Sequence, residues 1–312
     1  MKTKNKFLLF IFLVVGILFL RNNYALAQND AHGFSITPFF QEINISKDQN
    51  EVPFSIEVRN NTDTAIVLRV SVLDFGTLDE SGGVAFLGQS DNLKYGLASW
   101  ISLQNDTLVI NPGETQNLKG NIENKDSLSP GGHYGAIYFK TEDNEKITDE
   151  KQNIAFDSSF ASLLFVRKIG GEIFELNLNS KEYDSSVFNM PNSVKLRFQN
   201  SGNVHIAPRG IVEIADPFGR IVQKGIINEQ SGIVLPETFR LFTIKMMDLT
   251  EAFVPGRYKL SIEYRYDGKD DFTKDISSFF FVPPIFILSI LVLTAIGIAA
   301  YFRKKRKIKT NE

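Results

Sequence analysis

The sequence predicts an all-β fold, two tandem Ig-like β-sandwiches, followed by one C-terminal transmembrane α-helix. Short runs with a period near two recur between Gly, Pro and Asn clusters over residues 33 to 281, which is typical of β-sandwiches. This region contains no stretch with the apolar spacing of an amphipathic helix. Residues 279 to 302 then form an uncharged apolar run, long enough for a helix to cross a bilayer.

Charged residues at both ends of the chain predict its membrane topology. The cluster RKKRK at residues 303–307 follows the apolar run and is expected to stay in the cytoplasm. At the N-terminus, three lysines, an apolar stretch and a small-residue site ending at Ala27 indicate a cleaved signal peptide. An uncleaved anchor is the alternative. In both cases residues 28–282 face outward.

Turn and linker residues divide the chain further. The paired glycines Gly170 and Gly171 are permissive backbone and mark a boundary between two sandwiches. The charged segment 141–153 is either a linker or a hairpin loop, and we favour the loop because the apolar run 154–168 suits a last strand of the first sandwich. The predicted parts are a signal peptide (1–27), a first sandwich (28–169), a second sandwich (170–282), a transmembrane helix (283–302) and a basic cytoplasmic tail (303–312).

Composition narrows the environment and the partners. The chain has no cysteine, which excludes disulfides, thiolate metal sites and a lipoprotein anchor and fits a bacterial envelope protein. Residues 28–282 carry 24 basic and 35 acidic side chains, a net charge of about −11. A surface of this sign does not attract nucleic acid.

An internal repeat supports two related sandwiches. Two Asn-led turns end strands of similar pattern, and in each half a Pro precedes a Tyr by 22 positions. Each Tyr follows a Pro-Gly turn, so we expect its ring to be buried and its hydroxyl to bond nearby backbone, as in a tyrosine corner. The matched pairs are Asn60 with Asn200, Pro112 with Pro236, and Tyr134 with Tyr258.

Several segments resemble the WxL-interacting protein family. The segments GFSITPFF, NNTDTAIVLRVSV, LASWISLQNDTLVINPGET, PGGHYGAIYF and IAFDSSFASLLFVRK look like its first domain. The turn NSGN, the LPET segment and FVPGRYKLSIEY are similar to its second domain, and the closing helix with its basic tail matches the family layout. The resemblance implies a Gram-positive-type surface protein whose first domain is linked to peptidoglycan binding and whose second is linked to binding a host or partner protein.

No catalytic, cofactor-binding or metal site is predicted. The chain contains no nucleophile elbow, no P-loop and no Rossmann glycine pattern. Its three histidines, His32, His133 and His205, lie far apart in sequence without metal-ligand spacing, and His133 is expected at the surface or a strand edge. The acid pairs Asp79-Glu80 and Asp270-Asp271 suit solvated loop tips, with calcium as the alternative. Chance matches to N-x-S/T occur at Asn44, Asn60 and Asn105.

Two features are candidates for recognition, although the ligand-binding residues stay unassigned. Trp100 is the only tryptophan; either it fills the core, which its apolar neighbours favour, or it is exposed and stacks on a sugar ring. The segment from Gly82-Gly83 to Tyr95 reads as a long irregular loop, and loops at the ends of sandwiches often carry recognition.

The sequence therefore predicts a non-enzymatic, single-pass cell-membrane protein with an extracellular N-terminal ectodomain and a cytoplasmic C-terminus. Its partners would be cell-wall glycan (peptidoglycan), another surface protein, or both, and no small-molecule cofactor or nucleic acid is expected. The alternative is a chaperone-like or structural module for the assembly of an exported surface protein.

Overall fold

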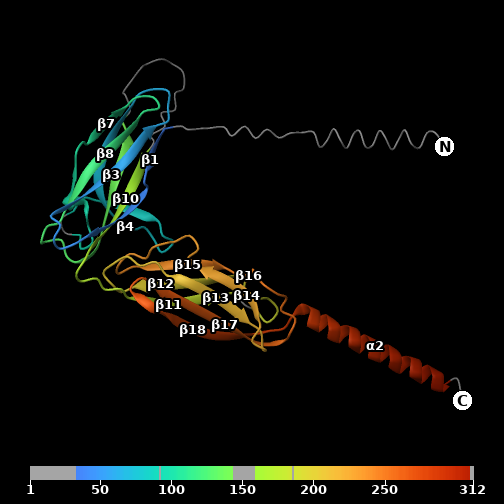
Figure 1. The fold of residues 1–312 in the computed structure, drawn as a ribbon. Helices are drawn as coiled ribbons and strands as arrows, with labels where there is room; N and C mark the ends of the chain where they lie inside the picture. The colour runs from blue at the N-terminus through green and yellow to red at the C-terminus, as the bar shows by residue number, and fades with distance from the viewer. Residues whose placement is uncertain (1–32, 91–92, 143–158, 185, 310–312) are drawn as a thin grey trace, which may run out of the picture.

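The computed structural model describes residues 33–90, 93–142, 159–184 and 186–309. Within these residues, two β-sandwiches follow one another and an α-helix leaves the far end of the second (Figure 1). The predicted fold class, tandem Ig-like sandwiches with an apolar C-terminal helix, is confirmed. The predicted signal peptide lies outside the described residues.

Ten strands build the first sandwich, and a short 3-10 turn, η1 (Ala98–Trp100), precedes β6. One sheet has the order β1-β3-β8-β6 and is called the β3 sheet below. The other, the β9 sheet, has the order β2-β10-β9-β4-β5, with β7 also pairing with β4. The strands are β1 (Phe34–Thr37), β2 (Phe40–Ile45), β3 (Glu51–Asn60), β4 (Ile66–Thr77), β5 (Val84–Gly88), β6 (Ile101–Leu103), β7 (Thr107–Ile110), β8 (Thr115–Glu123), β9 (Gly131–Thr141) and β10 (Ser159–Lys168).

The chain changes sheets at Pro38. Before it, β1 pairs antiparallel with β3; after it, β2 pairs parallel with β10. Proline has no backbone N–H for a ladder, so it suits the point where one pairing ends. The Thr37–Pro38 peptide bond is cis. After this change of pairing, β2 is an edge strand of the β9 sheet.

The two sheets of the first sandwich differ in how their faces are used. In β3, Phe54, Ile56 and Val58 are buried and alternate with exposed residues, as expected for a sheet with one solvated face. In β9, every residue from Gly131 to Ile137 is buried. Such continuous burial indicates a strand covered on both faces, so the β9 sheet carries a second apolar layer on its outer side.

The antiparallel pairing of β9 with β10 explains the apolar run that follows the charged segment. Their register runs from Lys140 opposite Ser159 to Gly131 opposite Lys168. The prediction that this run contributes a last strand of the first sandwich is therefore confirmed for Ser159–Lys168. The charged segment itself falls mostly in residues 143–158, outside the described part of the chain.

The second sandwich packs a three-stranded sheet, β11-β12-β15, against a five-stranded sheet, β16-β14-β13-β17-β18. Their facing side chains form one continuous core that includes Phe198, Val212, Tyr258 and Ile262. The strands are β11 (Leu176–Tyr183), β12 (Ser193–Asn200), β13 (Arg209–Ala215), β14 (Ile221–Ile227), β15 (Phe239–Lys245), β16 (Met247–Asp248), β17 (Gly256–Tyr266) and β18 (Lys269–Phe281).

The Asn repeat seen in the sequence is a repeat of structure. The Asn60 side-chain amide donates to the carbonyl oxygens of Thr64 (2.8 Å) and Ile110 (3.0 Å). Asn200 donates in the same way to Val204 (2.7 Å) and Val234 (2.9 Å). Both asparagines are fully buried, and each holds its own turn to a more distant strand end.

The two matched tyrosines behave differently. Tyr258 is buried and its hydroxyl donates to the Val254 carbonyl at 2.7 Å, so the predicted tyrosine corner is confirmed in the second sandwich. For Tyr134 the predicted burial of the ring is confirmed, but the predicted bond to nearby backbone is wrong: the hydroxyl lies 3.4 Å from Nδ1 of His205, in the other sandwich. The reason is that Tyr134 projects from the outer face of the β9 sheet, toward the domain junction.

The helix α2 (Pro284–Lys309) is the only described segment long and apolar enough to cross a membrane, over Pro284–Tyr301. The side chains of this span are not buried by the rest of the protein. The helix continues past Tyr301 into the predicted basic tail and ends at Lys309.

Candidate functional site

The candidate site is the outer side of the β9 sheet, the side away from the sandwich core. Positions on such a side usually carry polar residues that face water, but here the side chains are apolar. We call this set the apolar outer face. On β10, Ala161, Leu163 and Phe165 project from it, while the alternate residues of β10 point to the core. The members are Phe40, Phe75, Phe86, Tyr134, Ala136, Tyr138, Ala161, Leu163 and Phe165.

Aromatic rings organise this face. The rings of Phe75, Tyr134 and Phe165 lie 5.3 to 5.9 Å apart, centroid to centroid, in tilted and edge-to-face arrangements. Phe40 packs edge-on against Phe165 at 5.2 Å. Such contacts stabilise each other and hold the side chains in defined orientations. The aromatic side chains of this face are therefore packed against one another within the protein itself.

The second sandwich covers only one end of the apolar outer face. Leu235 and Ile233 pack into the Phe75–Tyr134–Phe165 cluster, and the His205 ring lies 5.3 Å from that of Phe165. Away from this contact, Phe40 is 46% exposed and Phe86 is 43% exposed. An apolar surface thus continues from the buried junction onto an open sheet.

Polar contacts connect the two sandwiches where they meet beside this face; Figure 1 shows the position of this junction. The Arg197 guanidinium binds both carboxylate oxygens of Glu80, and these hydrogen bonds hold the pKa of Glu80 below its usual value. The Leu241 amide donates to the Glu80 carbonyl at 2.8 Å. Lys94 forms an ion pair with Glu237. These contacts come from the β4–β5 turn and the segment after β5.

A buried histidine lies at the centre of the junction. His205 is 5% exposed, and within the described part of the chain its Nε2 has no hydrogen-bond partner. Burial lowers the pKa of His205 to about 4, and the positive charge of Arg167 acts in the same direction. The Glu42 carboxylate is 3.6 Å from Nε2 but is more than half exposed, so solvent screens its opposing effect. His205 is therefore neutral at pH 7.

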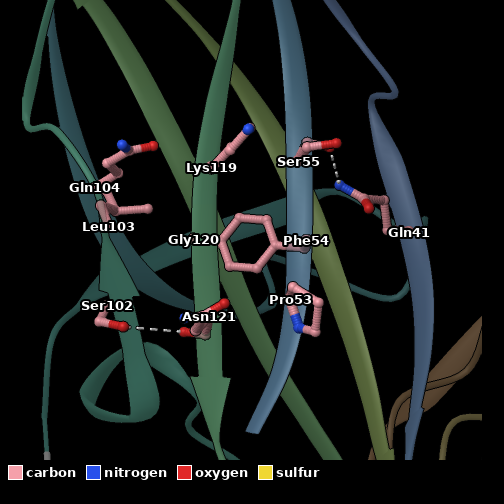
Figure 2. A pocket seen from close by; sticks show the side chains of 10 residues that line it. All are labelled: Gln41, Pro53, Phe54, Ser55, Ser102, Leu103, Gln104, Lys119, Gly120 and Asn121. Atoms are coloured by element: carbon pink, nitrogen blue, oxygen red, sulfur yellow. Dashed lines mark hydrogen bonds between the residues drawn. The ribbon is translucent and has the colours of Figure 1, made fainter.

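A second candidate is an open hollow of about 840 Å³ on the first sandwich, with a mixed polar and apolar lining, shown in Figure 2. The ring of Phe54 lies at Gly120, where any Cβ would come within 2.5 Å of the ring. The Gln41 amide donates to the Ser55 carbonyl at 3.3 Å. The hollow is lined by Gln41, Pro53, Phe54, Ser55, Ser102, Leu103, Gln104, Lys119, Gly120 and Asn121.

The two recognition candidates from the sequence lie near these surfaces without forming a site together. Trp100 is half-buried against the first core, with the Lys125 ammonium 5.5 Å from its ring. The predicted irregular loop is partly wrong, because Val84–Gly88 forms strand β5. A strand appears there since the segment pairs with β4. Its end nevertheless reaches the second sandwich, where the Tyr95 hydroxyl donates to Glu237 at 3.0 Å.

Two further residues noted in the sequence, His133 and Asp79, make hydrogen bonds within the fold. The prediction that His133 lies at the surface is wrong: it is 3% exposed, between the carbonyls of Gly96 and Ser129, because β9 is buried on both faces. Asp79 accepts hydrogen bonds from Ser81 in a turn. Among the described residues, no group of three or more His, Asp or Glu could hold a metal ion.

Sequence reasoning missed the apolar outer face itself. The available signal was the run from Phe160 to Val166, which lacks the polar alternation of a half-solvated strand. The sequence pair Phe39-Phe40 is a further signal, because two neighbouring Phe residues cannot both point into one core from a strand. In the structure both side chains are about half exposed.

Neither a protein-family model nor a curated protein sequence matches this chain. Among solved structures, the class 5 fimbriae chaperone CfaA is similar with a TM-score of 0.43 and 11% identity, over 78% of this chain and 99% of that one. A chaperone–tip adhesin complex of CFA/I fimbriae gives 0.44 and 13%, over 80% and 99%. The Pseudomonas aeruginosa CupB2 chaperone gives 0.34 and 12%, over 77% and 97%. Similarity this low does not bear on function.

Proposed function

We propose that this protein is a membrane-anchored surface protein that binds another exported protein on the apolar outer face of its first sandwich. One observation carries the proposal: the β9 sheet is apolar on both sides, yet the second sandwich covers only part of the outer side. Exposed aromatic residues in a contiguous patch mark interaction surfaces. The rigid junction beside the patch would present it at a fixed angle.

The edges of the β9 sheet suit a partner in extended conformation. The edge strands β2 and β5 each pair with one neighbour in the sheet. Each edge carries an exposed aromatic residue of the patch, Phe40 on β2 and Phe86 on β5. A partner strand added at an edge would gain backbone hydrogen bonds while its side chains contact the patch. We therefore propose an apolar, strand-forming segment of an exported protein as the ligand.

The anchor in this proposal is α2, with the sandwiches outside the cell and the C-terminus in the cytoplasm. Because the chain has no cysteine, single-cysteine variants test this directly. Glu57→Cys on the first sandwich should react with a membrane-impermeant maleimide on intact cells, and Thr310→Cys only after lysis. The reverse labelling pattern, or equal labelling of both, would contradict the orientation.

The binding test places a photo-crosslinking amino acid at Phe86 in the full-length protein in living cells. We expect adducts with one or a few exported proteins, and we expect Tyr138→Asp in the same chain to abolish them, because the Tyr138 ring packs beside position 86 on the same face. The matched control carries the crosslinker at Glu57, on the polar outer side of the β3 sheet. Equal adducts from Glu57, or adducts at Phe86 that survive Tyr138→Asp, would refute the proposal.

The fate of the captured protein separates a surface receptor from a chaperone-like module. If the protein is a receptor or scaffold, deleting it should release a stable partner from the cell surface. If it assists assembly, deletion should instead lower the amount of the partner through degradation. The resemblance to WxL-interacting proteins remains part of this proposal, with the partner-binding role assigned to the first sandwich rather than only to the second.

Cell-wall glycan is the second candidate ligand, and the hollow in Figure 2 is the observation in its favour. Amide and hydroxyl side chains surround an aromatic ring there, a combination suited to sugar hydroxyls and ring faces. Phe54 is only 6% exposed, which leaves little ring for stacking and ranks this candidate second. Retention of the full-length protein in nanodiscs on purified peptidoglycan tests it. Loss of retention in Asn121→Ala would support the glycan site, and unchanged retention would count against it.

A further inference from the structure

Six exposed apolar side chains gather at the end of the second sandwich from which α2 leaves. They come from three loops and the end of one strand, so no single element explains their clustering. We call this set the apolar rim. Its members are Val187 (46% exposed), Phe188 (51%), Phe218 (83%), Leu249 (54%), Phe253 (55%) and Phe280 (57%).

Contacts between these loops and the start of α2 place the rim beside the helix. The Val282 amide, two residues before α2, donates to the Val187 carbonyl at 2.6 Å. Phe188 and Phe253 line the same groove as Pro284 and Ile285, the first residues of the helix. Figure 1 shows these loop ends of the second sandwich where α2 begins.

The turn that carries Phe218 is rigid, and its geometry does not require an aromatic residue. The Asp216 carboxylate accepts hydrogen bonds from the backbone amides of Phe218 and Arg220, both at 2.9 Å. Pro217 packs close to Gly256 at the start of β17. These contacts shape the turn through backbone and capping groups. The Phe218 side chain itself is 83% exposed, so the turn holds its ring outward.

Basic groups lie among the rim residues. The Arg220 guanidinium lies 4.7 Å from the Phe253 ring and donates to the Glu251 carbonyl at 3.1 Å. Arg257 is exposed and pairs in register with Phe280. Aromatic and aliphatic side chains flanked by Arg are the composition of surfaces that rest at headgroup depth.

We infer that the apolar rim lies in the interface of the bilayer that α2 crosses, with lipid as its occupant. This inference rests on the proposed membrane insertion of α2. Only two residues separate β18 from the helix, so the rim cannot move far from the bilayer once α2 is inserted. The second sandwich is then held at the membrane by its loops as well as by its tether, which fixes its tilt.

The test uses single cysteines in the full-length chain, labelled with an environment-sensitive fluorophore and placed in nanodiscs. Phe218→Cys reports on the rim. Phe272→Cys is the control away from the rim: Phe272 is exposed to the same extent as the rim residue Phe280, 57%, and lies on the same strand but roughly 26 Å away along it. Leu291→Cys reports on the middle of α2. Nanodiscs are prepared with and without lipids that carry a quencher near the headgroup, and with lipids quenched deep in the acyl chains.

We expect shallow-quencher lipids to lower Phe218→Cys fluorescence at least about twofold and to leave Phe272→Cys unchanged, because the rim lies at headgroup depth. Deep-quencher lipids should reduce Leu291→Cys fluorescence. If Leu291→Cys is quenched and Phe218→Cys is not, the rim is not in the lipid and the inference is wrong while the anchor stands. If Leu291→Cys is not quenched, the anchor fails and this inference fails with it. A blue shift at Phe218→Cys without quenching would identify protein as the occupant and would also overturn it.

Discussion

Replacing Asn60 with alanine is expected to destabilise the first sandwich by about 3 kcal/mol. Asn60 is fully buried and its side chain ties three segments together. The amide donates to Thr64 and Ile110, and the carbonyl oxygen accepts from the backbone amide of Thr62 at 2.9 Å. Alanine cannot replace any of these bonds.

The magnitude follows from counting what is lost. Each net hydrogen bond contributes about 1 kcal/mol, and three are lost without replacement. A fourth, from the Thr62 hydroxyl at 2.7 Å, is not counted because that hydroxyl can donate to the Thr64 carbonyl at 2.8 Å instead. The buried Ile110 carbonyl would also lose the hydrogen bond from Asn60. A buried carbonyl without that partner adds a desolvation penalty to the free energy of folding. The neighbouring Asn61 is exposed and makes one side-chain bond, to Ser35 at 3.2 Å, so Asn61→Ala should cost less than about 0.5 kcal/mol.

The assay is urea unfolding followed by fluorescence of Trp100, the only tryptophan, which packs against the first core. With a denaturant slope of about 1–3 kcal/mol per molar, Asn60→Ala should lower the midpoint by about 1–3 M. Asn61→Ala should leave it nearly unchanged. Asn200→Ala, the equivalent change in the other sandwich, should move the Trp100 signal much less than Asn60→Ala. If Asn60→Ala and Asn61→Ala give the same midpoint, the repeated Asn bonds are not stabilising and the reasoning is refuted.

Three further predictions concern the junction, the second sandwich and the anchor. Because the folded His205 has a pKa of about 4 against about 6.5 when unfolded, the unfolded chain takes up its proton first as pH falls. Stability should therefore drop between pH 6.5 and 4, by on the order of 3 kcal/mol, and His205→Gln should flatten this part of the urea-midpoint profile; a parallel drop would contradict the assignment. Gly202→Ala should lower the melting temperature by several degrees, since a Cβ there would lie 2.0 Å from the Ile173 carbonyl oxygen; a change within error would show that the turn can adjust. Truncation before Pro284 should move the protein from the membrane pellet to the soluble fraction, and persistence in the pellet would argue against α2 as the anchor.

Much of the fold could be predicted from the sequence because most strands bury one face. Phe54, Ile56 and Val58 alternate with polar residues in the chain, and the structure places them on the inner side of β3. The paired Asn turns also carry enough local pattern to reveal the repeat. Local alternation determines which side of a strand is apolar when only one side is covered.

The sequence could not show where a strand is covered twice or where the chain changes sheets. His133 is buried because β9 is covered on both faces. The Tyr134 ring is buried as predicted, but it lies on the outer face of β9, so its hydroxyl meets His205 of the second sandwich and not its own turn. The sheet change at Pro38 depends on pairing with β10, more than a hundred residues later, which no local pattern contains. Phe40 and Phe86 look like core residues in sequence, and only the tertiary arrangement leaves them exposed.

The junction between the sandwiches links the two proposed surfaces mechanically. Its ion pairs lie at the surface and are half-exposed, and exposed pairs hold geometry weakly. The stronger constraints are the packing of Leu235 into the aromatic cluster and the backbone bond from Gly132 to the Asn203 carbonyl at 2.8 Å. Both constraints belong to the buried end of the apolar outer face. If the rim fixes the second sandwich on the bilayer, the same junction sets the height and direction at which the open end of that face meets a partner.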